Sequence, residues 1–141
     1  MISLNRLIRY ISGDDPPSVH WIAGLLARGW IGYSGTGSGG TVTQLTDKTT
    51  GVTLSRNTGV ITMINAALAA DTTVAFTLTN TLIAATDLLL VSHQSAGTLG
   101  AYSFASTPAA GSAVISVHNN TPGSLSEAIV LRFFLLKATS A

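Results

Sequence analysis

Residues 128–136 read Ala-Ile-Val-Leu-Arg-Phe-Phe-Leu-Leu, an apolar run interrupted only by Arg132. Side chains of a β-strand alternate between its two faces. One face of this run therefore carries Ile129, Leu131, Phe133 and Leu135. The other face carries Val130, Arg132, Phe134 and Leu136. Because both faces are largely apolar, the run predicts either a central strand or a strand whose second face is buried against another subunit.

Further β-prone segments precede this run, and turn residues recur about every 8–12 residues, which is typical of a sandwich or a barrel. Strict alternation in residues 74–79 places Val74, Phe76 and Leu78 toward the core. The apolar run at 88–93 predicts another central strand. The capping-box spacing of residues 124–127 predicts at most a helical turn before the last strand. The expected fold is mainly β, an antiparallel β-sandwich or jelly-roll-like domain. Its other predicted strands are 41–46, 51–54, 59–64, 101–105 and 113–118.

The composition changes near residue 35, where Gly35-Thr36-Gly37-Ser38-Gly39-Gly40 lacks side chains that could pack. Both Trp residues precede this stretch, and nearly all Thr residues follow it. A phosphate-binding loop would need a helix after it, and here a strand is expected instead. The sequence therefore predicts a short helical N-terminal arm at 1–34, a flexible linker at 35–40 and a β-sandwich domain at 41–141.

The arm combines apolar and basic residues. Leu4, Leu7, Ile8 and Ile11 recur at helical spacing, and a second short helix is expected after Asp15-Pro16. Short helices with so much apolar surface are not stable alone, so they need a surface on which to dock. We expect the arm to contact a larger assembly or a neighbouring subunit through Leu4, Arg6, Leu7, Ile8, Arg9, Ile11, Trp21, Ile22, Leu25, Arg28 and Trp30. In the β-domain, the expected oligomer interface is Val130, Arg132, Phe134 and Leu136.

Charged residues are scarce. Seven Lys and Arg and six Asp and Glu make up 9% of the 141 residues, against about 25% in a typical soluble domain. The scattered basic residues do not form the patch that a nucleic-acid binder needs. No uninterrupted apolar span reaches about 18 residues, so no transmembrane helix is expected. We therefore expect neither nucleic acid nor a membrane as a partner. Because little electrostatic repulsion separates copies, the composition favours a subunit whose surface is largely covered by other subunits.

The residues that could carry chemistry have simpler structural explanations. The chain has no Cys, and its three His residues lack the spacing of a zinc site. No Gly-x-Ser-x-Gly elbow accompanies the many Ser residues. Asp47, Asp71 and Asp87 lie at turn-like boundaries, where Asp caps the backbone, and Glu127 is the only Glu. Asn119-Asn120-Thr121 matches the glycosylation sequon. We expect no catalytic residues, no metal site and no cofactor.

Seven segments of residues 41–141 share their order and spacing with a known domain. They are Thr50–Leu54, Gly59–Met63, Ala66–Ala70, Val74–Asn80, Ile83–Asp87, Gly97–Tyr102 and Gly123–Val130. Through these segments the chain resembles a domain that recurs in tailed bacteriophages and prophages. The resemblance covers roughly 70% of the chain, and residues 1–34 fall outside it.

This resemblance implies a component of the virion: a head decoration (cement) protein, a head fibre, or a fibre or tail protein. We expect a capsid decoration protein at the capsid surface, a homo-oligomer and specifically a trimer. Its partner would be the major capsid protein or another virion protein. The alternative is a tail-fibre or receptor-binding module whose β-domain contacts a host glycan. The few aromatic residues of the β-domain, mostly at core-like positions, count against that alternative.

Overall fold

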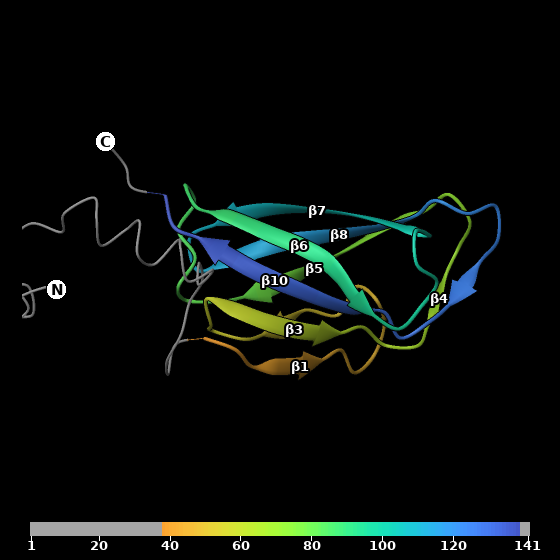
Figure 1. Ribbon diagram of the computed structural model, residues 1–141, viewed down its shortest axis with the longest axis horizontal. Helices are drawn as coiled ribbons and strands as arrows, with labels where there is room; N and C mark the ends of the chain where they lie inside the picture. Colours follow the sequence, from red (N-terminus) through yellow and green to blue (C-terminus); the bar gives the residue numbers. More distant parts are fainter. Residues whose placement is uncertain (1–37, 139–141) are drawn as a thin grey trace, which may run out of the picture. The chain divides into compact units, whose positions relative to one another are not determined.

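The computed structural model describes residues 38–138 of the chain. Within this range the chain forms ten strands and no helix, so the prediction of a mainly β domain is confirmed (Figure 1). The predicted helical arm at 1–34 and the first half of the linker, residues 35–37, lie outside the described residues.

Two four-stranded sheets make up most of the domain (Figure 1). Sheet A has the order β1 (Thr41–Thr43), β3 (Thr58–Thr62), β10 (Val130–Leu136), β6 (Leu88–Ser95). Sheet B has the order β2 (Val52–Thr53), β5 (Thr73–Thr79), β8 (Ser112–Asn119), β7 (Tyr102–Ala109). A third, two-stranded sheet pairs β4 (Ala67–Leu68) with β9 (Leu125–Ser126).

Both large sheets are mixed, so the prediction of a wholly antiparallel sandwich is wrong at two edge strands. β1 runs parallel to β3, and β2 runs parallel to β5, whereas the other pairs are antiparallel. The physical reason is the path of the chain. β1, β2 and β3 alternate between the two sheets, and each crossing reverses the chain direction. Two crossings restore the original direction, so strands that return to the same sheet are parallel.

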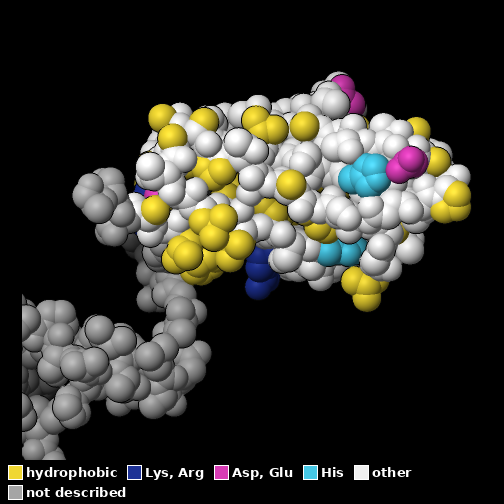
Figure 2. All heavy atoms as spheres, turned by 90° about the horizontal axis from the view of Figure 1, so that it is seen from above, with side chains coloured by type: hydrophobic (Ala, Val, Ile, Leu, Met, Phe, Trp, Pro, Cys, Tyr) yellow, Lys and Arg dark blue, Asp and Glu magenta, His cyan; other side chains and the backbone are white. Residues whose placement is uncertain are grey.

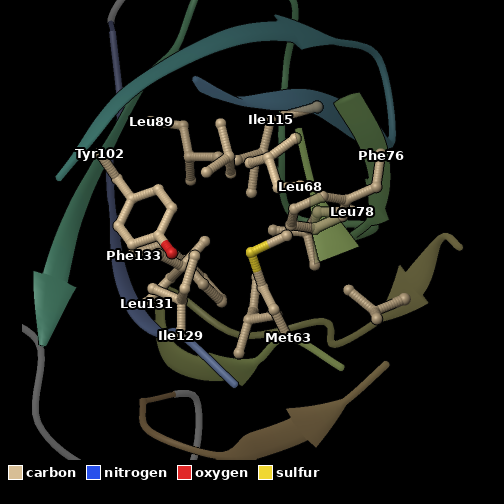
Figure 3. Close-up of a cluster of buried hydrophobic side chains, with 14 of the residues drawn as sticks. Met63, Leu68, Phe76, Leu78, Leu89, Tyr102, Ile115, Ile129, Leu131 and Phe133 are labelled. Atoms are coloured by element: carbon tan, nitrogen blue, oxygen red, sulfur yellow. The ribbon is translucent and has the colours of Figure 1, made fainter. Parts of the chain in front are cut away.

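The core lies between the two sheets (Figure 3). The inward-facing residues of β10 and the preceding Ile129 are at most 1% exposed, as the alternation predicts. In the opposite sheet, Phe76 and Leu78 of β5 are buried in the same core. Val74 is partly buried and packs against this core at its margin. Ile115 and Val117 of β8 complete the sheet B side. One continuous apolar layer therefore holds the sheets together.

The run at 88–93 forms an edge strand, so the prediction of a second central strand is wrong. β6 pairs with β10 in sheet A, and its other edge approaches β7 of sheet B, where the Ser106 hydroxyl donates a hydrogen bond to the Leu89 carbonyl. The run is apolar because Leu89 is buried while Leu88 and Leu90 face outward. β10 is itself central, between β3 and β6, which confirms that part of the prediction.

The structure forms no helical turn at 124–127, where the sequence allows at most one. Leu125 and Ser126 form β9, and the Glu127 carboxylate accepts hydrogen bonds from Thr98 and Tyr102. In a capping box this carboxylate would instead accept from the backbone amide of the capping residue. Contacts distant in sequence therefore override the local signal.

Candidate assembly surface

The outer face of sheet A carries the predicted interface residues of the β-domain. Alternation along β10 directs four side chains away from the core: Val130, Arg132, Phe134 and Leu136. The structure thus brings this set onto one face. The predicted contact residues of the arm lie outside the described residues.

Large hydrophobic side chains meet at one end of this face. Leu136 lies opposite Leu88, and Phe134 lies opposite Leu90, across the antiparallel pair β10–β6. Such opposite side chains are close enough to contact each other. The exposed fractions are 49% for Leu136, 49% for Leu88 and 52% for Leu90, whereas Phe134 is half-buried. We call these four residues the apolar block. Figure 2 shows hydrophobic side chains gathered toward one end of the domain, next to a basic side chain.

Sequence reasoning missed the β6 half of the apolar block. Leu88 and Leu90 were assigned to a central strand, and no outward contact was expected for them. The signal was nevertheless present, because Leu88-Leu89-Leu90 places leucine on both faces of a strand, as the β10 run does. A strand apolar on both faces has a partner on each face or exposes one of them.

Arg132 lies at the rim of the apolar block. It is the only Lys, Arg, Asp or Glu in the four strands of sheet A. On neighbouring strands it lies opposite Ser92 and Val60, and its Nε donates to the Gln94 side chain over 3.1 Å. A register shift in the β10–β6 pair accompanies this contact. Among the described residues, no carboxylate pairs with this guanidinium.

A groove of about 320 Å³ crosses the same face. Its walls include Val60, Arg132 and Phe134, together with Gly39 and Gly40. The Gly39 amide donates to the Thr58 hydroxyl over 3.0 Å, and the Gly40 carbonyl accepts from the Val60 amide over 2.9 Å. Both glycines have positive φ values, 75° and 130°, which side chains rarely tolerate. The end of the predicted linker is therefore bound to the sheet and borders the groove.

The carboxylates considered as catalytic candidates bind the backbone in the described domain. Asp47 accepts from the Thr49 amide over 2.8 Å, and hydrogen bonds from the Thr49 side chain and backbone lower its pKa. Asp87 accepts from the Ala84 amide over 2.7 Å. Its hydrogen bond with the Lys137 ammonium, at 2.5 Å, is the main cause of its lowered pKa. The predicted turn-capping roles of these two residues are confirmed.

Glu127 forms hydrogen bonds to the 96–101 loop and to Tyr102, at the end of the domain away from the apolar block. Its carboxylate accepts from the Tyr102 hydroxyl at 2.5 Å and from the Thr98 amide and hydroxyl at 2.9 and 2.7 Å. These hydrogen bonds, with that of Tyr102 foremost, lower the pKa of Glu127. Burial, and then the neighbouring carboxylate, raise the pKa of Tyr102. The network fixes the 96–101 loop and the start of β7 to the segment between β9 and β10.

Lys48 is a buried cation beside this network. It is 3% exposed, and its Nζ donates to the carbonyl oxygens of Ile64 and Glu127 over 2.9 and 2.7 Å. Burial lowers the pKa of Lys48, and the Glu127 charge opposes this effect. Both contacts are to backbone carbonyls, so Lys48 joins the loop after β1 to the segment before β10.

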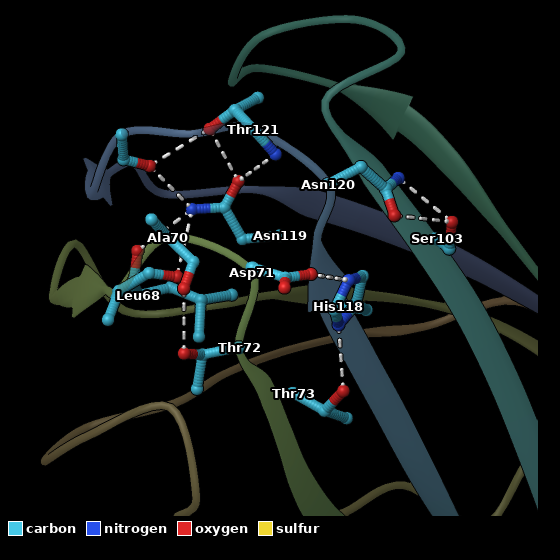
Figure 4. Close-up of polar contacts among 12 residues, drawn as sticks. Leu68, Ala70, Asp71, Thr72, Thr73, Ser103, His118, Asn119, Asn120 and Thr121 are labelled. Carbon is cyan, nitrogen blue, oxygen red and sulfur yellow. Dashed lines mark hydrogen bonds and ion pairs between the residues drawn. The ribbon is translucent and has the colours of Figure 1, made fainter.

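Thr73, His118 and Asp71 form a row that resembles a nucleophile, base and carboxylate (Figure 4). The Thr73 hydroxyl lies 2.9 Å from His118 Nδ1, and Asp71 Oδ1 lies 3.3 Å from Nε2. The Asp71 side chain is 92% exposed, so solvent screens the pair and weakens its hold on the imidazole. His93 belongs to β6 in sheet A and His118 to β8 in sheet B, so they are not on adjacent strands.

The acceptor asparagine of the glycosylation sequon is buried in the folded domain. Asn119 is fully buried, and its Nδ2 donates to the carbonyl oxygens of Leu68, Ala69 and Gly123 (Figure 4). Its Oδ1 accepts from the Thr121 amide over 3.0 Å. An Asn side chain so engaged cannot carry a glycan in this fold, so the residue serves to fasten the β4 and β9 loops.

Comparisons with known proteins add no relative. No protein-family model, no curated protein and no solved structure matches the chain. Across residues 38–138, no cluster of three or more His, Cys, Asp or Glu residues could hold a metal ion. In the same range, no helix is long and apolar enough to cross a membrane.

Proposed function

We propose that this chain is a non-enzymatic structural subunit of a bacteriophage virion. Its specific role would be that of a capsid decoration (cement) protein, which binds the head surface as a homo-oligomer, a trimer, and stabilises it. The observation that carries the proposal is the exposed apolar block on sheet A, with one cation at its rim. An apolar centre with a polar rim is the usual anatomy of a protein–protein interface. The resemblance of residues 41–141 to a phage domain supplies the virion context.

The strand edges of both sheets are protected, which favours association through a sheet face instead. Exposed strand edges are the other common route by which β-proteins join. Here β1 and β2 have only three and two residues, and β7 contains Pro108. β6 approaches β7 through the Ser106–Leu89 hydrogen bond. These are known means of protecting edges, so the outer face of sheet A is the better candidate for contacts with other subunits.

The position of the apolar block suits attachment at one end of the domain. Phe134 lies opposite Thr58, which binds the Gly39 amide at the start of the described chain. Leu136 ends β10, two residues before the described chain stops at Ala138. Both ends of the described range, near Gly39 and Ala138, therefore share one end of the domain with the apolar block. An attachment there leaves the loops at the far end directed outward.

Mass spectrometry of purified virions tests the virion assignment. A decoration protein is present in many copies per particle, comparable to the major capsid protein. Absence from the particle, or only the few copies typical of a tail component, would contradict the assignment.

Sedimentation of the full chain tests the surface. Replacing Leu90 and Leu136 by Ser should shift the oligomer toward monomer, because the block loses its apolar area. Val114→Ser is the matched control, since Val114 is 46% exposed on the outer face of sheet B. Equal effects of the two sets of variants would contradict the assignment of the interface to sheet A.

A further inference from the structure

Arg132 defines the chemistry of what covers the groove. An occupant of this face must be apolar enough for Phe134 and the leucines, and it must bring a carboxylate for the guanidinium. Three of the four carboxylates of residues 38–138 are held by several hydrogen bonds within the fold, and the fourth, Asp71, is exposed beside His118 of sheet B. Asp47 binds Thr49, Asp71 binds His118, Asp87 binds Lys137, and Glu127 binds Tyr102 and Thr98.

The same face of a second copy does not meet this requirement. Arg132 is the only charged residue in the strands of sheet A, so two identical faces in contact would bring two guanidinium groups toward each other without a carboxylate. Like charges placed together in an interface cost binding energy. The occupant therefore differs in sequence from the face that it covers.

The N-terminal segment of this chain carries one acidic pair, Asp14 and Asp15, which lies at least five residues along the sequence from its three arginines, Arg6, Arg9 and Arg28. Asp14 and Asp15 are the only carboxylates outside the described residues. They lie between two apolar stretches, with Ile8 and Ile11 before them and Trp21 and Ile22 after them. Residues 1–34 therefore offer apolar side chains on both sides of an acidic pair, as the face requires.

We propose that residues 1–34 of a neighbouring copy cover the groove and the apolar block, with the Asp14-Asp15 pair at Arg132. The inference rests on the self-association in the proposed function. Gly39 and Gly40 are bound to the sheet, so the remaining part of the linker is residues 35–38, which spans up to about 14 Å when extended and can carry the N-terminal segment to a neighbouring copy beside this face. Because Gly39 and Gly40 border the groove, each copy's linker starts beside the face that receives a neighbour's segment. Each copy then gives its N-terminal segment to one neighbour and receives the segment of another, so the contacts close into a ring.

A charge exchange in the full chain tests the ion pair. Arg132→Glu should raise the dissociation constant of the oligomer roughly tenfold or more, because the two carboxylates then face a third. Asp14→Lys with Asp15→Lys should have a similar effect. The combined variant should recover most of the affinity. Arg56→Glu, an exposed arginine outside the strands of sheet A, is the control. No recovery in the combined variant would overturn the pairing.

Cross-linking distinguishes docking between copies from docking within one copy. The chain contains no Cys, so single cysteines can be introduced without background. A tagged copy with Asp14→Cys is mixed and refolded with an untagged copy carrying Ser92→Cys, the residue opposite Arg132. A disulfide between tagged and untagged chains is expected. A diluted double variant that forms only the intrachain disulfide would overturn exchange between copies, as would no disulfide in either sample.

These outcomes separate the inference from the proposed function. If virions contain many copies and the oligomer persists while neither cysteine pair forms a disulfide, the N-terminal segment does not cover the face, and the decoration role stands. If disulfides form between copies but the protein is absent from virions, the docking inference stands and the virion assignment fails.

Discussion

Gly59 shows how closely single residues are fitted in sheet A. It lies in β3 opposite Phe133 of β10. A Cβ atom at this position would lie 2.6 Å from Leu54 Cδ2 and 2.7 Å from Phe133 Cε1, closer than real Cβ contacts allow. The missing side chain thus leaves space for the Phe133 ring and Leu54. This glycine serves packing rather than a turn.

Gly59→Ala should destabilise the domain by about 1–3 kcal/mol, because the extra methyl group overpacks a buried site. Urea unfolding followed by circular dichroism measures the change. Gly123→Ala is the control, since a Cβ there meets nothing within 4 Å. If both variants unfold at the same urea concentration as the wild type, the space at Gly59 is not limiting.

Asp87 should make stability depend on pH. The hydrogen bond from Lys137, and then that from Ala84, lower the pKa of Asp87 in the folded state below the ordinary 3.8. The charged carboxylate therefore stabilises the fold above the ordinary value, and this contribution is lost as pH falls through the folded-state pKa. Asp87→Asn should lower the urea midpoint at neutral pH, and its difference from the wild type should narrow below about pH 4. Asp71→Asn, at an exposed carboxylate, is the control. A difference that stays constant down to acid pH would contradict this role.

At the scale of the strand, the side chains of β10 alternate between the core and the outer face, so the two faces can be tested separately for roles in folding and in the proposed association. Leu135 is fully buried, whereas its neighbour Leu136 is 49% exposed. Leu135→Ala should cost about 2–5 kcal/mol of unfolding free energy, as truncations in a packed core do. Leu136→Ala should leave unfolding of the monomer nearly unchanged and weaken the oligomer. Urea unfolding and sedimentation of both variants measure the two effects. A large loss of monomer stability in Leu136→Ala would contradict the assignment of Leu136 to the outer face alone.

Local patterns predicted the strands well because alternation is a property of the strand itself. The order Ile129, Leu131, Phe133, Leu135 was sufficient to find one buried face. Position within a sheet depends on neighbours instead. Leu88-Leu89-Leu90 looks the same whether β6 is central or at an edge, so its edge position could not be predicted. The parallel pairing of β1 and β2 likewise depends on which sheet each strand joins, which no local pattern encodes.

The candidate surface was predictable only in part, for the same reason. Val130, Arg132, Phe134 and Leu136 belong to one strand, so parity alone grouped them. The contribution of Leu88 and Leu90 required the register between β6 and β10. The groove beside Val60 required Gly39 and Gly40 to bind the edge of β3, and a glycine-rich stretch carries no sign of such binding.

At the scale of the whole molecule, the described domain has a complete core of its own. Every buried hydrophobic residue of that core lies between Val52 and Leu135. Deleting residues 1–37 should therefore leave a folded β-domain with cooperative thermal unfolding, measured by circular dichroism. The truncated chain should also lose binding to its particle, measured by co-sedimentation with virions that lack the protein. A truncated chain that fails to fold would place part of the N-terminal segment in the core.

The central place of the last strand has a consequence for biosynthesis. All four strands of sheet B are complete once the ribosome has made Asn119. Sheet A, by contrast, has β10 between β3 and β6, so it stays divided until residues 130–136 have been made. Nascent chains fold as their segments emerge. The outer face of sheet A, which we propose as the contact surface between copies, therefore forms after sheet B, and nascent chains that still lack β10 cannot assemble through it.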